Sequence, residues 1–149
     1  MQRTTISIFI VFASLALALG CASTPPPTPA QPWNQARASL LAEEMSKSAD
    51  AWQLEVRQAN PDRLGAGSSE EGMGLTQKTQ FVSEQARALA GRLKAGDGRE
   101  QTYDDFRSLK EQMDDVQVIQ ARTALGDQVP LAWAKFRRDY EQLKPYYEK

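Results

Sequence analysis

Four long segments in which apolar residues recur every three or four positions constrain the fold most. The first follows Pro32 and ends at Asn60-Pro61, because the residue before a proline avoids helical backbone angles. The others are expected over about 75–95, from Thr102 to about 125, and after Asp127. This spacing places apolar side chains on one face of a helix, and no segment has the period of two that indicates a strand.

The predicted core consists of the members of these four stripes. They are Ala38, Leu41, Met45, Ser48, Trp52, Val56 and Ala59; Leu75, Thr79, Val82, Ala86, Leu89 and Leu93, with Phe81 and Ala90 alongside; Phe106, Leu109, Met113, Val116, Gln120 and Thr123, with Ile119; and Val129, Trp133, Phe136, Tyr140, Leu143 and Tyr147. The stripes repeat about every seven residues, which favours helices crossing near 20°. We therefore predict an all-α, up-down-up-down four-helix bundle over residues 33–149.

Turn and capping residues separate the predicted helices. Residues 62–74 contain four glycines, so we expect a surface loop there. Gly96-Asp97-Gly98 is predicted to end the second helix. Thr102 with Asp105 resembles a capping box, which predicts the start of the third helix at this point.

The last connection contains residues that favour a tight turn. Gly126 is a good C-cap and Asp127 a good N-cap, so we expect them to join the third and fourth helices directly. Pro130 then falls in the first turn of the fourth helix, where proline is tolerated. Pro145 removes a hydrogen bond near the end of that helix, and we expect a kink or fraying there.

Residues 1–20 have the layout of a secretory signal. One positive charge, Arg3, precedes an apolar run of 14 residues from Ile6 to Leu19. That run is shorter than the roughly 20 residues that cross a bilayer as a helix. Gly20 and Cys21 follow, and Cys21 is the only cysteine in the chain, so it forms no internal disulfide.

Ala18-Leu19-Gly20-Cys21 resembles the lipobox of bacterial lipoprotein precursors. Gly20 and Cys21 match, whereas Ala18 replaces the usual leucine and Leu19 the usual small residue; the resemblance covers only the first 21 residues. It implies cleavage before Cys21, a diacylglycerol thioether on Cys21 and a palmitate-like acyl chain on the new amino terminus. Several acyl chains on one residue make an effectively permanent membrane anchor. The residue after the cysteine is Ala22 rather than an aspartate, and by the same resemblance this implies sorting to the outer membrane.

A proline-rich linker, residues 21–32, separates this anchor from the predicted bundle. Residues 22–32 contain five prolines, which favour extended polyproline II backbone over helix or sheet. At about 3.1 Å per residue, the linker would hold a domain roughly 30 Å from the lipid surface.

The composition of the mature chain argues against several chemistries. Arg3 is the only charged residue of the leader, so 17 basic and 19 acidic residues remain, and this balance gives no electrostatic case for nucleic acid. Histidine is absent and cysteine occurs once, which excludes Cys-x-x-Cys-His haem attachment and the Glu-x-x-His pairs of di-iron bundles. The adjacent acidic pairs, such as Asp114-Asp115, are expected on solvated faces. We predict no enzyme activity and no catalytic, cofactor-binding or metal-ligating residue; Cys21 is the one predicted site residue.

Two aromatic residues lie off the apolar stripes. Trp33 and Tyr146 are therefore candidates for a partner surface, while Tyr146 and Tyr147 together are candidates for covering one end of the bundle.

The sequence leads to a first functional hypothesis and two alternatives. The first is a non-enzymatic, lipid-anchored envelope protein on the periplasmic face of the outer membrane, acting as an interaction or assembly module. A small-ligand binding bundle with an apolar cavity is the second. The third is covalent cell-wall attachment through Lys149, since the chain ends in lysine and is similar in this one respect to the major outer-membrane lipoprotein of enteric bacteria.

Overall fold

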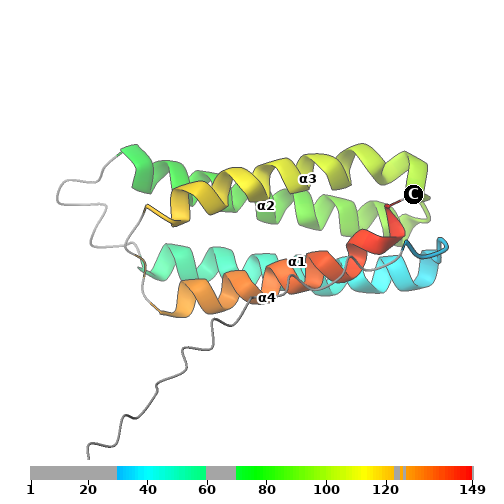
Figure 1. The fold of residues 1–149 in the computed structure, drawn as a ribbon, viewed down its shortest axis with the longest axis horizontal. Coiled ribbons are helices and arrows are strands. Elements are labelled where there is room, and N and C mark those ends of the chain that lie inside the picture. Colours follow the sequence, from blue (N-terminus) through cyan, green and yellow to red (C-terminus); the bar gives the residue numbers. More distant parts are fainter. Residues whose placement is uncertain (1–29, 60–69, 123–124, 126, 149) are drawn as a thin grey trace, which may run out of the picture.

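The computed structural model describes residues 30–59, 70–122, 125 and 127–148 of the 149-residue chain. Its elements are α1 (Gln35–Ala59), α2 (Glu70–Ala95), α3 (Arg99–Gln120), α4 (Gln128–Leu143) and the single 3₁₀ turn η1 (Lys144–Tyr146). The helices alternate in direction, and the described residues contain no strand (Figure 1). The predicted all-α, up-down-up-down four-helix bundle is confirmed.

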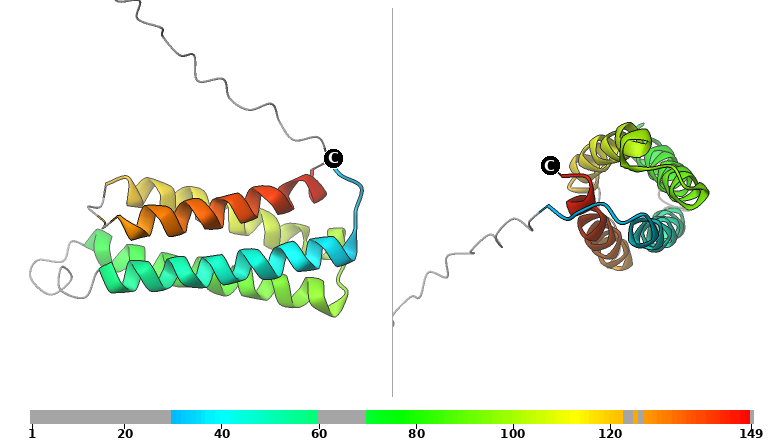
Figure 2. Two further views of the ribbon diagram at one scale, coloured as in Figure 1. Left: turned by 90° about the horizontal axis from the view of Figure 1, so that it is seen from below. Right: turned by 90° about the vertical axis from the view of Figure 1, so that its right-hand side faces the viewer.

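The four helices form a ring that is not equally tight all round. Backbone contacts are close between α1 and α2, between α1 and α4, and between α2 and α3. Helices α3 and α4 lie farther apart, and Figure 2 shows the four helices end-on around a common core. The seam between α3 and α4 is therefore filled by long side chains rather than by close backbone packing.

The core consists mainly of the predicted apolar stripes. Among the large side chains, Trp52, Phe136, Met45 and Leu89 are fully buried. Ala59 and Ile119 are partly buried at the edge of the core. Phe81 was predicted to widen the second stripe, and this is wrong, since 46% of its surface is exposed. Phe81 immediately precedes buried Val82, and successive helical side chains point about 100° apart, so Phe81 is turned out of the core.

Helix α2 begins at Glu70, five residues before the predicted start at Leu75. The predicted loop over 62–74 is therefore wrong for residues 70–74. Glycine lowers helix propensity by about 1 kcal/mol per residue, but extending an existing helix by one residue adds a hydrogen bond without a new nucleation cost. The helical turn that contains Gly74 is thus stabilised by the packed part of α2 that follows it in the chain.

The capping box predicted at Thr102 is also wrong. Helix α3 begins at Arg99 after the N-cap Gly98, which makes no side-chain capping bond. Thr102 lies inside the first turn, where its hydroxyl donates to the Gly98 carbonyl at 2.9 Å. Threonine within a helix commonly makes this bond to the carbonyl four residues back. The Thr102 hydroxyl therefore bonds within the helix and does not cap its start together with Asp105.

The connection from α3 to α4 is longer than predicted. Helix α3 ends at Gln120, so Gly126 does not cap it, and the expected tight turn is wrong. Asp127 does occupy the N-cap position of α4, although its side chain makes no capping bond. Pro130 lies in the first turn of α4, as predicted. Near Pro145, where a kink or fraying is predicted, α4 changes into the 3₁₀ turn η1.

Helix α1 has a capping bond that the sequence spacing did not indicate. The Asn34 side-chain oxygen accepts the backbone N–H of Arg37 at 3.0 Å, which satisfies one of the unpaired donors at the start of the helix. The helix ends at Ala59, directly before Asn60-Pro61, as predicted.

Trp133 is a sensitive test of this core. Its ring centroid lies 4.8 Å from that of Trp52, and it joins α4 to α1. We expect Trp133→Ala to lower the free energy of unfolding by about 3–5 kcal/mol, measured by urea denaturation followed by circular dichroism. Leu131→Ala on the same helix is the control, because Leu131 is 64% exposed. A similar loss in both variants would contradict the assignment of Trp133 to the core.

Candidate functional site

Both ends of the described chain meet at one end of the bundle. The segment leading into α1, the α2–α3 turn and η1 all lie there, as Figures 1 and 2 show. The backbone N–H of Gln31 donates to the Pro145 carbonyl at 2.9 Å. The Arg99 guanidinium donates to the carbonyls of Tyr147 and Glu148 at 2.9 and 2.8 Å. These bonds hold the entering chain and the C-terminal turn side by side.

The α2–α3 turn at this end depends on a glycine. Gly96 has a φ of 102°, and its N–H donates to the Leu93 carbonyl at 3.2 Å. This left-handed residue ends α2 at low steric cost. The Gln35 side chain of α1 then donates to the carbonyls of Leu93 and Asp97 at 2.7 and 3.0 Å. The turn is thereby tied to the start of α1.

Aromatic stacking closes the wide α3–α4 seam at the same end. The ring of Phe106 on α3 is nearly parallel to the rings of Tyr147 and Tyr140, with centroid distances of 4.1 and 4.9 Å. Trp33 contacts Tyr147 edge-on at 5.5 Å. The Tyr147 hydroxyl is within hydrogen-bond distance of the Thr102 hydroxyl, at 2.7 Å. The stack joins α3, α4 and the chain entry where their backbones stand apart.

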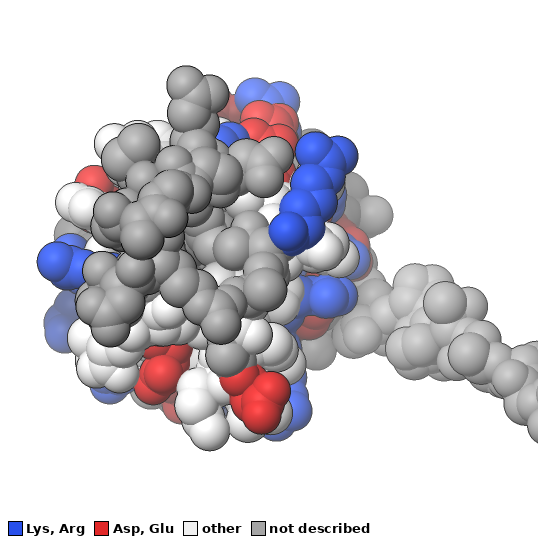
Figure 3. Space-filling view, turned by 90° about the vertical axis from the view of Figure 1, so that its left-hand side faces the viewer, with Lys and Arg blue, Asp and Glu red and all other residues white. Residues whose placement is uncertain are grey.

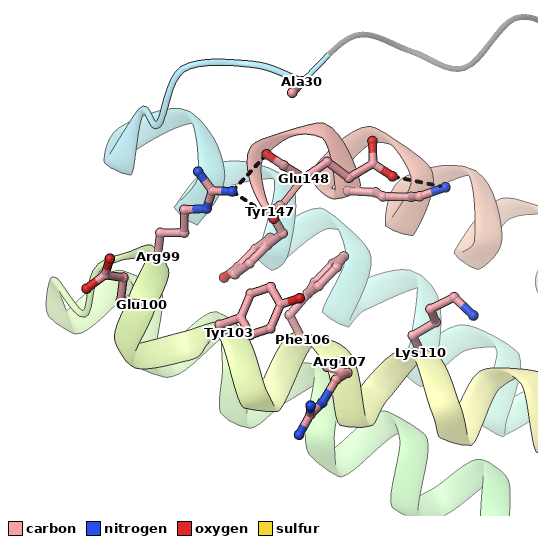
Figure 4. Close-up of a pocket in the computed structure, with 10 residues that line it drawn as sticks. Ala30, Arg99, Glu100, Tyr103, Phe106, Arg107, Lys110, Tyr147 and Glu148 are labelled. Carbon is pink, nitrogen blue, oxygen red and sulfur yellow. Dashed lines mark hydrogen bonds and ion pairs between the residues drawn. The ribbon is translucent and has the colours of Figure 1, made fainter.

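A groove of about 880 Å³ lies beside this stack, between α3 and η1. We call it the α3–η1 groove. In Figure 4, Tyr103, Phe106 and Tyr147 point toward one another inside it. Tyr103 remains 44% exposed. The lining residues are Ala30, Arg99, Glu100, Tyr103, Phe106, Arg107, Lys110, Lys144, Tyr147 and Glu148.

Three cations at the rim of the groove are paired with exposed carboxylates. Such surface pairs contribute only about 0–1 kcal/mol each, so a ligand can replace them at little cost. Glu141, together with Glu148, raises the pKa of the Lys144 ammonium. The pairs are Arg107 with Asp104 at 3.3 Å and with Glu111 at 4.0 Å, Lys110–Asp114 at 2.5 Å, and Lys144 with Glu141 and Glu148, each at 3.4 Å.

Tyr147 and Tyr140 keep their protons at neutral pH. Burial raises the pKa of Tyr147 to about 12. Burial also raises the pKa of Tyr140, with a smaller contribution from Glu141. Among the described residues, the Tyr140 hydroxyl has no hydrogen-bond partner. The groove thus offers neutral aromatic rings and exposed cationic donors, an arrangement suited to non-covalent recognition.

The two aromatic residues that lie off the apolar stripes are located differently from expectation. Tyr146 is buried, so its assignment to a partner surface is wrong. Trp33 is half-buried against Tyr147 and donates to the Gln35 side-chain oxygen at 3.1 Å, so it too serves the bundle end. The prediction that Tyr146 and Tyr147 cover one end is confirmed. Cys21 and Lys149 lie outside the described residues.

Sequence reasoning missed the groove itself. Its main contributors on α3 are Arg99, Tyr103, Arg107 and Lys110. They follow a three-four spacing of their own, beside the apolar stripe that contains Phe106. This second stripe on α3, which combines cationic residues with a tyrosine outside the core, is the sequence signal that indicates the groove.

Two other hollows on the described surface are smaller, at about 490 and 380 Å³. Apart from Tyr103, the large apolar side chains that are well exposed among the described residues are spread over all four helices: Leu40, Leu54, Phe81, Val118 and Leu131. The opposite end of the bundle carries side chains of both charges (Figure 3). Within the described ranges, no three acidic or cysteine residues come together as a metal site requires. None of the helices described is both long and apolar enough to cross a membrane.

Comparison with known proteins gives no relative. No family model matches the chain, and no curated protein or solved structure is significantly similar to it.

The raised pKa of Tyr147 predicts a pH-dependent loss of stability. Below pH 10, its ordinary pKa, the tyrosine is protonated in both the folded and the unfolded chain. Between pH 10 and about 12, the unfolded chain loses this proton while the folded chain keeps it, so ionisation favours unfolding. We expect the wild type to lose roughly 1–2 kcal/mol more than Tyr147→Phe between pH 9 and pH 11.5.

Urea denaturation at the two pH values measures this difference. Tyr103→Phe is the control, because Tyr103 is exposed, and it should lose stability as the wild type does. Equal losses in the wild type and Tyr147→Phe would show that Tyr147 is not buried against Phe106.

Proposed function

We propose that this protein is a lipid-anchored component of the bacterial cell envelope whose helical bundle binds a partner without catalysis. The observation that carries the proposal is the position of the α3–η1 groove beside the point where the linker enters the bundle. Ala30 lines that groove and Cys21 precedes Ala30 by nine residues. An extended chain rises at most about 3.3–3.6 Å per residue, so an anchor on Cys21 would keep the groove within roughly 30 Å of the lipid surface.

The chemistry of the groove supports recognition of a protein segment. Tyr103 presents an exposed aromatic face, and aromatic residues together with arginine are enriched in protein interfaces. Arg107 and Lys110 are held only by exposed carboxylates and have side-chain exposures of 61% and 53%. They are available to donate to carbonyl or carboxylate oxygens of a partner. Confinement to one surface would raise the effective concentration of groove and partner.

The groove also favours one alternative, binding of a small ligand. Its volume lies within the roughly 300–1,000 Å³ typical of ligand sites. Trp33 contacts Tyr147 in the groove lining, so its fluorescence should respond to lipids, quinones or haem if one of them binds. The third hypothesis, attachment to the cell wall through Lys149, has less support. Glu148 is held by Arg99 at the same bundle end as Ala30, so the described chain leads toward both proposed attachment residues from one end of the bundle.

The anchor is tested by replacing its attachment residue. We expect the wild-type protein, extracted from its native membrane, to have the mass of a chain beginning at Cys21 plus diacylglycerol and acyl chains. Cys21→Ser should lack the lipid mass and be either unprocessed or released from the membrane, because serine cannot form the thioether. Ser23→Ala is the matched control and should remain lipidated. A wild-type species without lipid in the soluble fraction would overturn the anchor.

The partner surface is tested by photo-crosslinking in the intact envelope. A photoreactive residue in place of Tyr103 should give a discrete crosslinked product, because Tyr103 is the exposed aromatic residue of the groove. The same residue in place of Leu131, which is exposed on α4, is the control and should not give that product. Adding Arg107→Ala and Lys110→Ala should reduce the yield several-fold. The same product at both positions, or no loss in the double variant, counts against the groove.

A further inference from the structure

We propose that the α3–η1 groove is a polyproline-binding surface and that its occupant is the proline-rich segment of this same chain, residues 22–29. This inference goes beyond the proposed function, since it concerns how the bundle is held on its own linker. The linker and an external partner would use the same residues of the groove, so a partner would have to displace the segment. The test below is made without a partner and therefore does not depend on the proposed function.

The route of the chain leads this segment to the groove. The backbone N–H of Gln31 donates to the Pro145 carbonyl, and the preceding residue, Ala30, is part of the groove lining. Figure 4 shows the segment that leads into α1 running past the C-terminal turn as far as Ala30. The proline-rich segment is joined directly to Ala30, so it would need no long loop to reach the groove.

The segment and the groove have complementary chemistry. Residues 22–29 read Ala-Ser-Thr-Pro-Pro-Pro-Thr-Pro, with four prolines and no charge. Such a segment favours the polyproline II helix, whose carbonyls make no internal hydrogen bonds. Aromatic-lined grooves recognise this conformation by packing proline rings against aromatic faces. Tyr103 supplies an exposed face, and Arg107 and Lys110 supply donors for the free carbonyls.

The absence of charge in the segment distinguishes it from other occupants. An acidic peptide would instead replace Asp104 and Asp114 at the cations of the groove. A neutral polyproline helix accepts hydrogen bonds from Arg107 and Lys110 while their exposed ion pairs remain in place. Docking also costs little conformational entropy, because the polyproline helix is already extended before it binds.

The lengths agree as well. Eight residues of polyproline II span about 25 Å at 3.1 Å per residue. The α3 residues of the groove run from Arg99 to Lys110, which is roughly 16 Å at 1.5 Å per residue. The segment therefore covers the groove with residues to spare. Docking would bring Cys21 to the α3–α4 side of the bundle, so that this side faces the lipid and the outer faces of α1 and α2 point away.

Paramagnetic relaxation enhancement tests the docked position directly. The mature chain, residues 21–149, is purified without its leader so that Cys21, its only cysteine, can carry a nitroxide label. We expect selective loss of amide signal intensity along α3 around Arg107 to Asp114, relative to the reduced label. Neither a membrane nor a partner is present, so the result is independent of the proposed function.

Two variants separate docking from simple proximity of the label. Replacing Pro25, Pro26 and Pro27 by serine should reduce the α3 effect several-fold and leave weaker, unselective broadening around the bundle end. Tyr103→Ala should do the same, and because Tyr103 is exposed the fold should persist, as circular dichroism can verify. Leu131→Ala is the matched control and should keep the wild-type pattern. An α3 effect that is absent in the wild type, or unchanged in the triple variant, would falsify the proposal.

Discussion

The stack of Phe106 on Tyr140 and Tyr147 is the interaction on which the rest of this structure depends. Helices α3 and α4 have few close backbone contacts, so the ring of four helices is completed there by side chains. Phe106 reaches from α3 to rings on α4 and on the C-terminal turn, at centroid distances of 4.9 and 4.1 Å. Aromatic pairs of this kind contribute about 0.5–1.5 kcal/mol beyond the area they bury.

The same stack makes the groove. Large rings bridge the seam by holding the two backbones apart, and the space beside them is bounded by Arg99 on one helix and Lys144 on the other. The hydrogen bonds from Arg99 to Tyr147 and Glu148 hold the C-terminal turn against α3. Structural closure of the bundle and the candidate recognition surface thus depend on one set of contacts. The segment that leads into α1 is held at the same place, because Trp33 contacts Tyr147 and the Gln31 N–H donates to the Pro145 carbonyl.

The proposed lipid anchor would orient the bundle relative to the membrane. A permanent lipid attachment would leave the bundle free to move only within the reach of its linker, and linker docking would reduce that freedom further. The bundle would then present chosen faces to the membrane and to the periplasm, which is the property an assembly module needs. Recognition would depend on orientation as much as on affinity, because both partners would be confined to one layer of the envelope.

The three-four spacing of residues such as Trp52, Leu89 and Phe136 was enough to predict the four helices and nearly all of the core, because this spacing is a local consequence of helix geometry. The sequence also indicated that Tyr147 covers one end. It could not show the contacts between distant segments: the Thr102 hydroxyl lies against the Tyr147 hydroxyl, and Trp33 packs inward. The groove likewise depends on how α3 packs against the chain beyond α4. Periodicity shows which face of a helix is buried, but the spacing between two helices depends on the side chains that meet between them.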